Sequence, residues 1–113
     1  MPSVKITIKV EPNNSRKDIY LIAKREFLEE SKIVEDIIEL AKEGEPSAQY
    51  RLGEIYQKGK GVTRSDIVAL MWYIISEQNG HKNAGKSKEF TEQYMAIDQI
   101  TLAYKMAQQW MEN

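Results

Sequence analysis

The chain has 113 residues, with 16 lysine and arginine residues against 17 aspartate and glutamate residues and a formal net charge of −1. This length suits one domain, and 42% of hydrophobic residues is enough for one continuous core. No block of like charge stands out, which argues against nucleic acid or an anionic membrane as the main partner, and the absence of cysteine excludes disulfides and thiolate chemistry.

The segment that comes first, residues 1–15, is predicted to form an extended or mobile N-terminal arm. Residues 4–10 alternate apolar and polar side chains, a strand pattern, but nothing else in the sequence offers a strand to pair with it. Three alternatives stay open. The arm lies extended against the helices, pairs with the same segment of a second molecule to give a homodimer, or is disordered.

Residues 16–113 are predicted to form a helical domain whose first hairpin spans about residues 16–43. A helix from Arg16 to about Glu30 is indicated by apolar residues at helical spacing. These are Ile19, Ile22, Ala23 and Phe27. Ser31 is predicted to break the helix or to cap the next one, which runs to about Lys42 and ends at Gly44.

The second hairpin is predicted over about residues 45–79. Pro46 stands at the first helical position, where no backbone donor is needed. Gly59 and Gly61 interrupt the helical pattern, and residues 63–66 have the form of a capping box that begins at Thr63. Gly80 supplies the left-handed residue that commonly ends a helix.

A third hairpin is predicted over about residues 82–111. Its first helix runs from Lys82 to about Tyr94, with Ala84, Phe90 and Tyr94 as its larger apolar anchors, and the chain turns at residues 95–98. Its last helix carries apolar residues on one face. These are Ile100, Ala103, Ala107 and Trp110.

An internal repeat links the first two hairpins, because residues 41–48 align with residues 77–84 at an offset of 36 residues. A period of this size is typical of stacked helix hairpins. The motif A-Q-x-x-L-G-x-x-Y-x-x-G-x-G-V, followed by D-x-x-A-x-x-W-Y and G-H-x-x-A, resembles the Sel-one-like repeat, a relative of the tetratricopeptide repeat. The matching residues are Ala48, Gln49, Leu52, Gly53, Tyr56, Gly59, Gly61, Val62, Asp66, Ala69, Trp72, Tyr73, Gly80, His81 and Ala84.

The predicted fold is therefore all-α: a short right-handed α-solenoid of about three helix hairpins with an extended N-terminal arm. The resemblance implies that Trp72 and Tyr73 pack between hairpins and that Gly53 is a close-packing position. It also implies a protein–protein interaction module, an adaptor or scaffold of the kind found in bacterial signalling, secretion and host interaction. The alternative is a dedicated inhibitor or immunity-type protein that binds one toxin or enzyme.

Catalytic equipment is not expected. The sequence has one histidine, His81, and no recognisable nucleophile or metal-protease motif, so we predict no enzyme, no cofactor and no metal site. The Gly59-Lys60-Gly61 segment lacks the rest of a phosphate loop and is better explained as a chain reversal. The carboxylates Glu29 and Glu30 are interpreted as a solvated helix face.

The functional surface is predicted on the first helix of the central hairpin. Tyr50, Glu54 and Gln57 fall at positions i, i+4 and i+7, opposite the face that carries Leu52. In tetratricopeptide-like solenoids this helix usually lines the concave surface. Tyr50, Arg51, Glu54 and Gln57 are therefore the candidate contact residues for another protein or peptide.

The compartment is predicted from the same sequence. No apolar run approaches the roughly 18 residues needed to span a bilayer, so membrane insertion is not expected. The first ten residues lack the apolar core and cleavage site of a signal peptide. The expectation is a cytoplasmic protein if the chain is full length, and a periplasmic or secreted one if a leader was trimmed.

Overall fold

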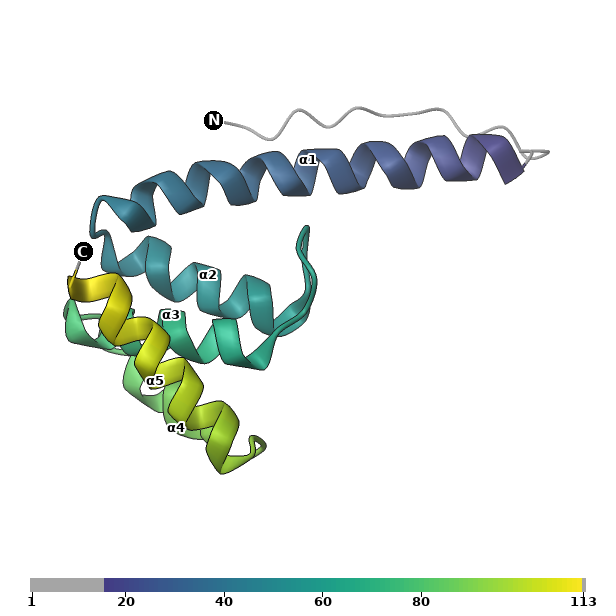
Figure 1. Cartoon of the computed structure of the whole chain (residues 1–113). Coiled ribbons are helices and arrows are strands. Elements are labelled where there is room, and N and C mark those ends of the chain that lie inside the picture. Colours follow the sequence, from purple (N-terminus) through teal and green to yellow (C-terminus); the bar gives the residue numbers. More distant parts are fainter. Residues whose placement is uncertain (1–15, 113) are drawn as a thin grey trace.

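A computed structural model of the chain describes residues 16–112. Five helices follow one another in this range (Figure 1). They are α1 (Arg16–Lys42), α2 (Pro46–Lys58), α3 (Asp66–Gln78), α4 (Ala84–Glu92) and α5 (Ile97–Glu112). The described part contains no strand, so the all-α prediction is confirmed. The predicted N-terminal arm lies outside the described residues.

The first predicted hairpin is wrong, because residues 16–42 form the single helix α1 of 27 residues. Ser31 does not break it. No glycine or proline stands near this position, and a lone serine costs a helix too little to end it. Its hydroxyl instead donates to the carbonyl of Gly61 in the α2–α3 loop, at 3.3 Å. The helix ends where the sequence predicts, before Gly44 at φ 94°.

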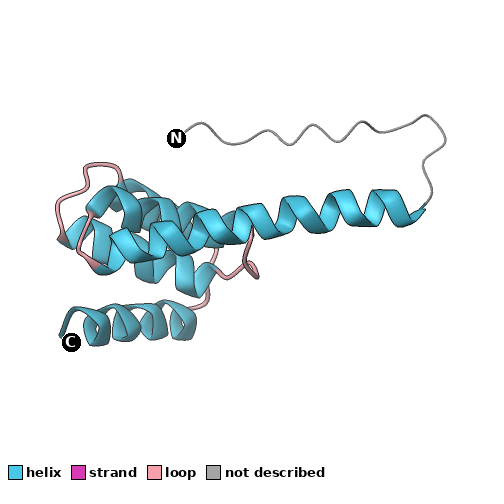
Figure 2. Cartoon of the chain, turned by 90° about the horizontal axis from the view of Figure 1, so that it is seen from above, coloured by secondary structure: helices cyan, strands magenta, loops and turns pink. Residues whose placement is uncertain are grey.

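The α1 overhang, defined as residues 16–29, is the part of α1 that precedes this contact with the loop. Figure 2 shows it extending beyond the other helices. Ile19, predicted to belong to a buried stripe, is 59% exposed there. The periodicity of the overhang is real, but within the described residues no second helix of this chain packs beneath it.

Helices α2 and α3 form a hairpin where the sequence predicts the central one. Pro46 opens α2, and Gly59 ends it at φ 75° with its N–H bonded to the carbonyl of Ile55. The cap of α3 is Ser65, whose hydroxyl accepts from the N–H of Val68 at 3.2 Å, so the prediction of a cap at Thr63 is wrong. The helix starts later because Ser65 N–H is still bonded to the carbonyl of Tyr56 at the end of α2.

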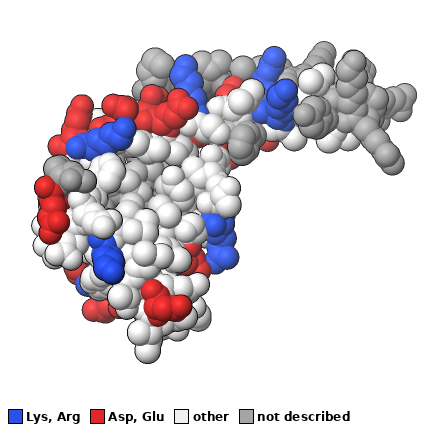
Figure 3. Space-filling view, viewed as in Figure 1, with Lys and Arg blue, Asp and Glu red and all other residues white. Residues whose placement is uncertain are grey.

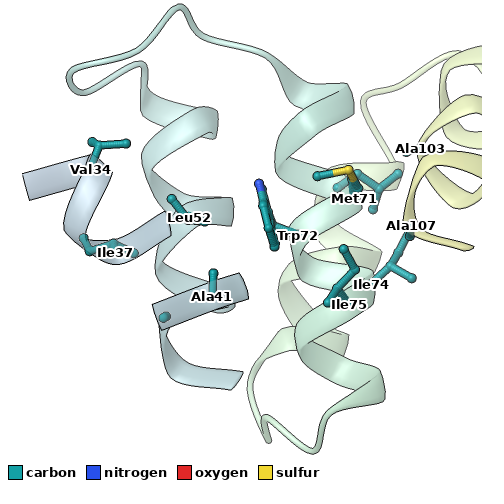
Figure 4. Close-up of a cluster of buried hydrophobic side chains, with 12 residues drawn as sticks. Val34, Ile37, Ala41, Leu52, Met71, Trp72, Ile74, Ile75, Ala103 and Ala107 are labelled. Carbon is teal, nitrogen blue, oxygen red and sulfur yellow. The ribbon is translucent and has the colours of Figure 1, made fainter. Parts of the chain in front are cut away.

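Helix α3 is the centre of the core, and every residue from Ala69 to Ser76 is buried. A helix that is covered all round must have neighbours on every side, and α2, α4 and α5 supply them. Figure 4 shows the resulting cluster. Trp72 is 5% exposed and meets the ring of Trp110 edge-on at a centroid distance of 5.0 Å, so its predicted core position is confirmed.

The second observed hairpin, α4 and α5, lies on the other side of α3 from α1 (Figure 1). Ala103 and Ala107 are fully buried against α3, as their spacing predicts. Phe90 and Tyr94 are 57% and 74% exposed, so the prediction that they anchor this helix is wrong. They point outward at the C-terminal end of α4, and their rings pack against each other at a centroid distance of 5.3 Å.

Candidate functional site

The four predicted contact residues do not form one outward surface. Tyr50 and Gln57 face α4, whereas Arg51 and Glu54 line a groove between α1 and α2. The helical spacing that grouped Tyr50, Glu54 and Gln57 is correct. What the spacing could not reveal is that α4 covers part of this face of α2.

Tyr50 is half-buried rather than projecting into solvent. Its hydroxyl lies 3.1 Å from the hydroxyl of Ser87 in α4, and its ring stacks on His81 at 4.2 Å with an interplanar angle of 7°. His81 itself accepts a hydrogen bond at Nδ1 from the N–H of Asn83, just before α4. Tyr50 therefore joins the central hairpin to the start of the next one.

Gln57 is held at both ends of its amide. Its Oε1 accepts from the hydroxyl of Tyr73 at 2.8 Å, and its Nε2 donates to Thr91 Oγ1 in α4 at 3.0 Å. Burial raises the pKa of Tyr73, and the nearby Glu54 and Tyr50 raise it further. The phenol is consequently neutral and serves as a fixed donor, so Gln57 is part of the packing between α2, α3 and α4.

The α1–α2 groove has a volume of about 310 Å³. Aliphatic side chains from both helices line it, and charged side chains surround them. The aliphatic residues are Ile33, Val34 and Ile55, and the charged ones are Glu30, Arg51, Glu54, Lys58 and Lys60. The α2–α3 loop closes one end, because Gly61 approaches the backbone of Glu30 so closely that an added Cβ would lie 3.0 Å from it.

The charges around this groove are unpaired. Among residues 16–112, none of these five side chains takes part in an ion pair within 4.0 Å. Arg51, Lys58 and Lys60 are exposed. The groove therefore combines an apolar floor with charges that are free to meet those of a bound molecule.

Sequence reasoning identified Arg51 and Glu54 but missed the residues that α1 and the loop contribute. The groove requires α1 to continue past Ser31, and the sequence was interpreted as a break at that position. The spacing of Arg51, Ile55 and Lys58 at i, i+4 and i+7 was the available indication of a mixed charged and apolar face.

A second cavity of about 330 Å³ lies where the C-terminal ends of α1, α3 and α5 meet, beside Trp110. Gln49 lines it and is 1% exposed. Its amide donates to the carbonyl of Ala41 at 3.0 Å and accepts from the side chain of Asn79 at 2.9 Å. Both ends of this buried amide are satisfied, which explains it as a structural tie between α1 and the α3–α4 turn.

The described residues contain neither a metal-binding cluster nor a membrane-spanning helix. No group of three or more histidine, cysteine, aspartate or glutamate side chains in residues 16–112 is placed to hold a metal ion. None of the helices in this range is long and apolar enough to cross a membrane.

Comparison with known proteins identifies a known repeat in the central hairpin. A sequence model of the Sel1 repeat matches residues 46–81, which are α2, α3 and the loop between them. Residues 46–81 are therefore similar to one Sel1 repeat. The predicted resemblance is confirmed, and Sel1 repeats are generally modules for protein–protein interaction and typically non-catalytic.

A solved structure supports the same fold. It is c5321, described as a protective antigen present in uropathogenic Escherichia coli strains displaying an SLR fold. This chain and c5321 are 30% identical in sequence, and their structures match with a TM-score of 0.69. The match covers 74% of this chain and 18% of c5321. The chain thus spans less than a fifth of the length of that relative. No curated protein matches the chain. The prediction of a short solenoid of helix hairpins is confirmed.

Proposed function

We propose that this Sel1 repeat chain is an adaptor or scaffold whose partner protein docks in the α1–α2 groove. The observation that carries the proposal is the groove itself, with its aliphatic floor and its five unpaired charges. In this proposal Arg51 and Glu54 contact the partner. Tyr50 and Gln57 support the groove from behind by holding α2 against α4.

The size of the groove favours a protein segment over a small molecule. About 310 Å³ is at the lower end of the range for small-molecule sites, which is roughly 300–1,000 Å³. Such a volume suits one or two large side chains of a partner. Interfaces commonly owe most of their affinity to a few anchor side chains in pockets, surrounded by contacts that exclude water.

The charges around the floor support specificity. Exposed charges at the rim of an interface contribute mainly to the association rate and to the choice of partner. Arg51, Glu54 and Lys58 stand on α2 and Glu30 on α1, so the α2 wall carries both signs of charge and the α1 wall a negative one. A partner with the complementary order of charges would dock in one orientation.

The test is to capture partners from native lysate with the wild-type chain and with Arg51→Glu/Lys58→Glu. The matched control is Lys86→Glu/Lys105→Glu, which makes the same change in charge at exposed positions on α4 and α5. A captured protein is then purified and its Kd measured for all three chains. We expect the groove variant to bind at least about tenfold more weakly and the control to bind like wild type.

A third variant tests the floor. Ile33 is 47% exposed, so Ile33→Asn removes apolar surface from the groove with little loss of core packing. It should weaken the same partner while the melting temperature stays close to that of wild type. Undiminished binding by both groove variants would show that the partner binds another surface. Failure to capture any protein would contradict the adaptor function.

A further inference from the structure

The charges along α1 are separated into a basic half and an acidic half. Residues 16–25 contain four basic residues and one acidic residue, a net charge of +3, whereas residues 26–39 contain six acidic residues and one basic residue, a net charge of −5. A helix is stabilised by negative charge near its N-terminus and by positive charge near its C-terminus. This effect is confined to the first and last turns, and the last turn of α1 carries Lys42, so the helix dipole does not account for the separation of charge over residues 16–39.

Figure 3 shows the same separation on the surface, with acidic side chains gathered at the end of α1 near the body and basic ones toward the overhang. Among the side chains of α1 that the structure describes, the only ion pair joins Lys42 to Glu39 at 3.8 Å. The other described charges of α1 have no such partner in this part of the chain, so the separation of charge is not neutralised there.

The outer face of α1 also carries exposed apolar side chains. Leu21 and Leu28 are 51% and 57% exposed and lie seven residues apart, on one side of the helix. Leu28 is nine residues from the buried Ile37, about two and a half turns, so this face points away from the body. Lys24, Arg25, Glu35 and Asp36 recur on this face at helical spacing and are all exposed. We call these six residues the outer face of α1, namely Leu21, Lys24, Arg25, Leu28, Glu35 and Asp36.

We propose that two copies of this chain associate through antiparallel packing of their outer faces. A second copy in antiparallel orientation brings the basic half of each α1 beside the acidic half of the other, while a parallel arrangement opposes like charges. Two-fold symmetric dimers of this isologous kind are the commonest homo-oligomers. The complementarity identifies the second copy as the occupant of this face.

The sequence also suggests the register. When Arg25 of one copy lies opposite Glu35 of its partner, Lys24 lies opposite Asp36, because both pairs are centred on residue 30. Leu28 of each copy is then within two residues of the two-fold axis and lies opposite the exposed Lys32 of its partner, so that Leu28 packs on the aliphatic stem of this lysine. Almost the whole of α1 takes part, which at 1.5 Å per residue is about 40 Å of helix.

This dimer does not depend on the proposed docking groove. Glu30 and Val34, which line the groove, lie on the side of α1 that faces α2, and the outer face lies opposite. It is also distinct from a dimer through residues 1–12, which the strand pattern of the sequence leaves open. Failure of either proposal would therefore leave the other standing.

The test uses sedimentation equilibrium of the full chain, at protein concentrations that detect a Kd up to about 1 mM. The wild type should approach twice the mass of the 13.1 kDa chain at low ionic strength. It should dissociate near 1 M salt, where charges are screened beyond about 3 Å. A wild type that stays monomeric under all these conditions would overturn the proposal.

Charge reversal then tests the pairing. Lys24→Glu/Arg25→Glu and Glu35→Lys/Asp36→Lys should each weaken self-association at least about tenfold, because each opposes like charges across the interface. Mixing the two variants should give a heterodimer, and combining all four substitutions in one chain should restore the homodimer. In a parallel pair the separate substitutions would not weaken self-association, so unchanged dimers would overturn the antiparallel arrangement.

Leu28→Lys should also dissociate the dimer, with Leu102→Lys as the control, since Leu102 is 45% exposed on α5, away from the outer face. Circular dichroism confirms that each variant keeps its helices. A chain that lacks residues 1–12 should still dimerise. If that deletion alone abolishes the dimer while Leu28→Lys leaves it intact, the interface is the N-terminal segment and the proposal fails.

Discussion

Replacing Gly53 with alanine should destabilise the protein, although alanine is the better helix former. An alanine Cβ at this position would lie 2.5 Å from Cδ1 and 2.9 Å from Cζ of Tyr73. Ordinary contact begins near 3.4 Å, so the ring would have to move by about 1 Å. It has little room to do so, because Tyr73 is 1% exposed and its hydroxyl is bonded to Gln57.

The net effect follows from two opposing contributions. Overpacking a rigid site costs about 1–3 kcal/mol, and the upper part of this range applies because the ring is held at both ends. The gain in helix propensity from glycine to alanine is about 1 kcal/mol. Gly53→Ala should thus lower the free energy of unfolding by about 2 kcal/mol, which corresponds to a fall in melting temperature of about 10 °C for a domain of this size.

The assay is thermal and urea-induced unfolding followed by circular dichroism, for the wild type and Gly53→Ala in two backgrounds. In a Tyr73→Leu background the ring is absent, so the same substitution should be neutral or stabilising by up to about 1 kcal/mol. A Gly53→Ala variant that melts above the wild type would show that the ring of Tyr73 does not sit against this glycine. The same loss of stability in both backgrounds would also refute the reasoning.

Three further predictions concern the core. Trp72→Ala should cost about 3–5 kcal/mol in urea unfolding, because it removes a buried ring that packs on Trp110, and an unchanged midpoint would contradict its core position. Burial raises the pKa of Tyr73, so the native state keeps a proton that the unfolded chain loses near pH 10. Stability should therefore fall as the pH rises above about 10, and Tyr73→Phe should flatten this decline in urea unfolding measured across that range. Gln49→Leu should cost about 1–3 kcal/mol, because it removes both the side-chain donor to the carbonyl of Ala41 and the acceptor of the Asn79 amide, and calorimetry that finds no loss would contradict this role.

The site could be predicted only in part, and α4 is the reason. The periodicity of α2 placed Tyr50 and Gln57 opposite Leu52, which is correct, since Leu52 is fully buried toward α1 and α3. Whether the opposite face meets solvent depends on where α4 packs, and that is a property of the three-dimensional arrangement. The bonds from Tyr50 to Ser87 and from Gln57 to Thr91 join residues more than thirty positions apart.

The sequence by itself determined the central hairpin. Gly59 must adopt a left-handed conformation that other residues avoid, Pro46 fits only the start of a helix, and the apolar spacing fixes which faces of α2 and α3 meet. These constraints act within a few residues, so they can be predicted without a structure. The same locality made the family motif recognisable.

Only the tertiary structure decided that α1 is continuous and that a groove lies between α1 and α2. Ser31 is compatible with a helix interior or with a cap, and the choice depends on Gly61, thirty residues away, whose carbonyl accepts from its hydroxyl. Local preferences at such a position differ by less than about 1 kcal/mol, which a single distant contact can outweigh. The groove exists because that contact holds the α2–α3 loop against a helix that does not stop there.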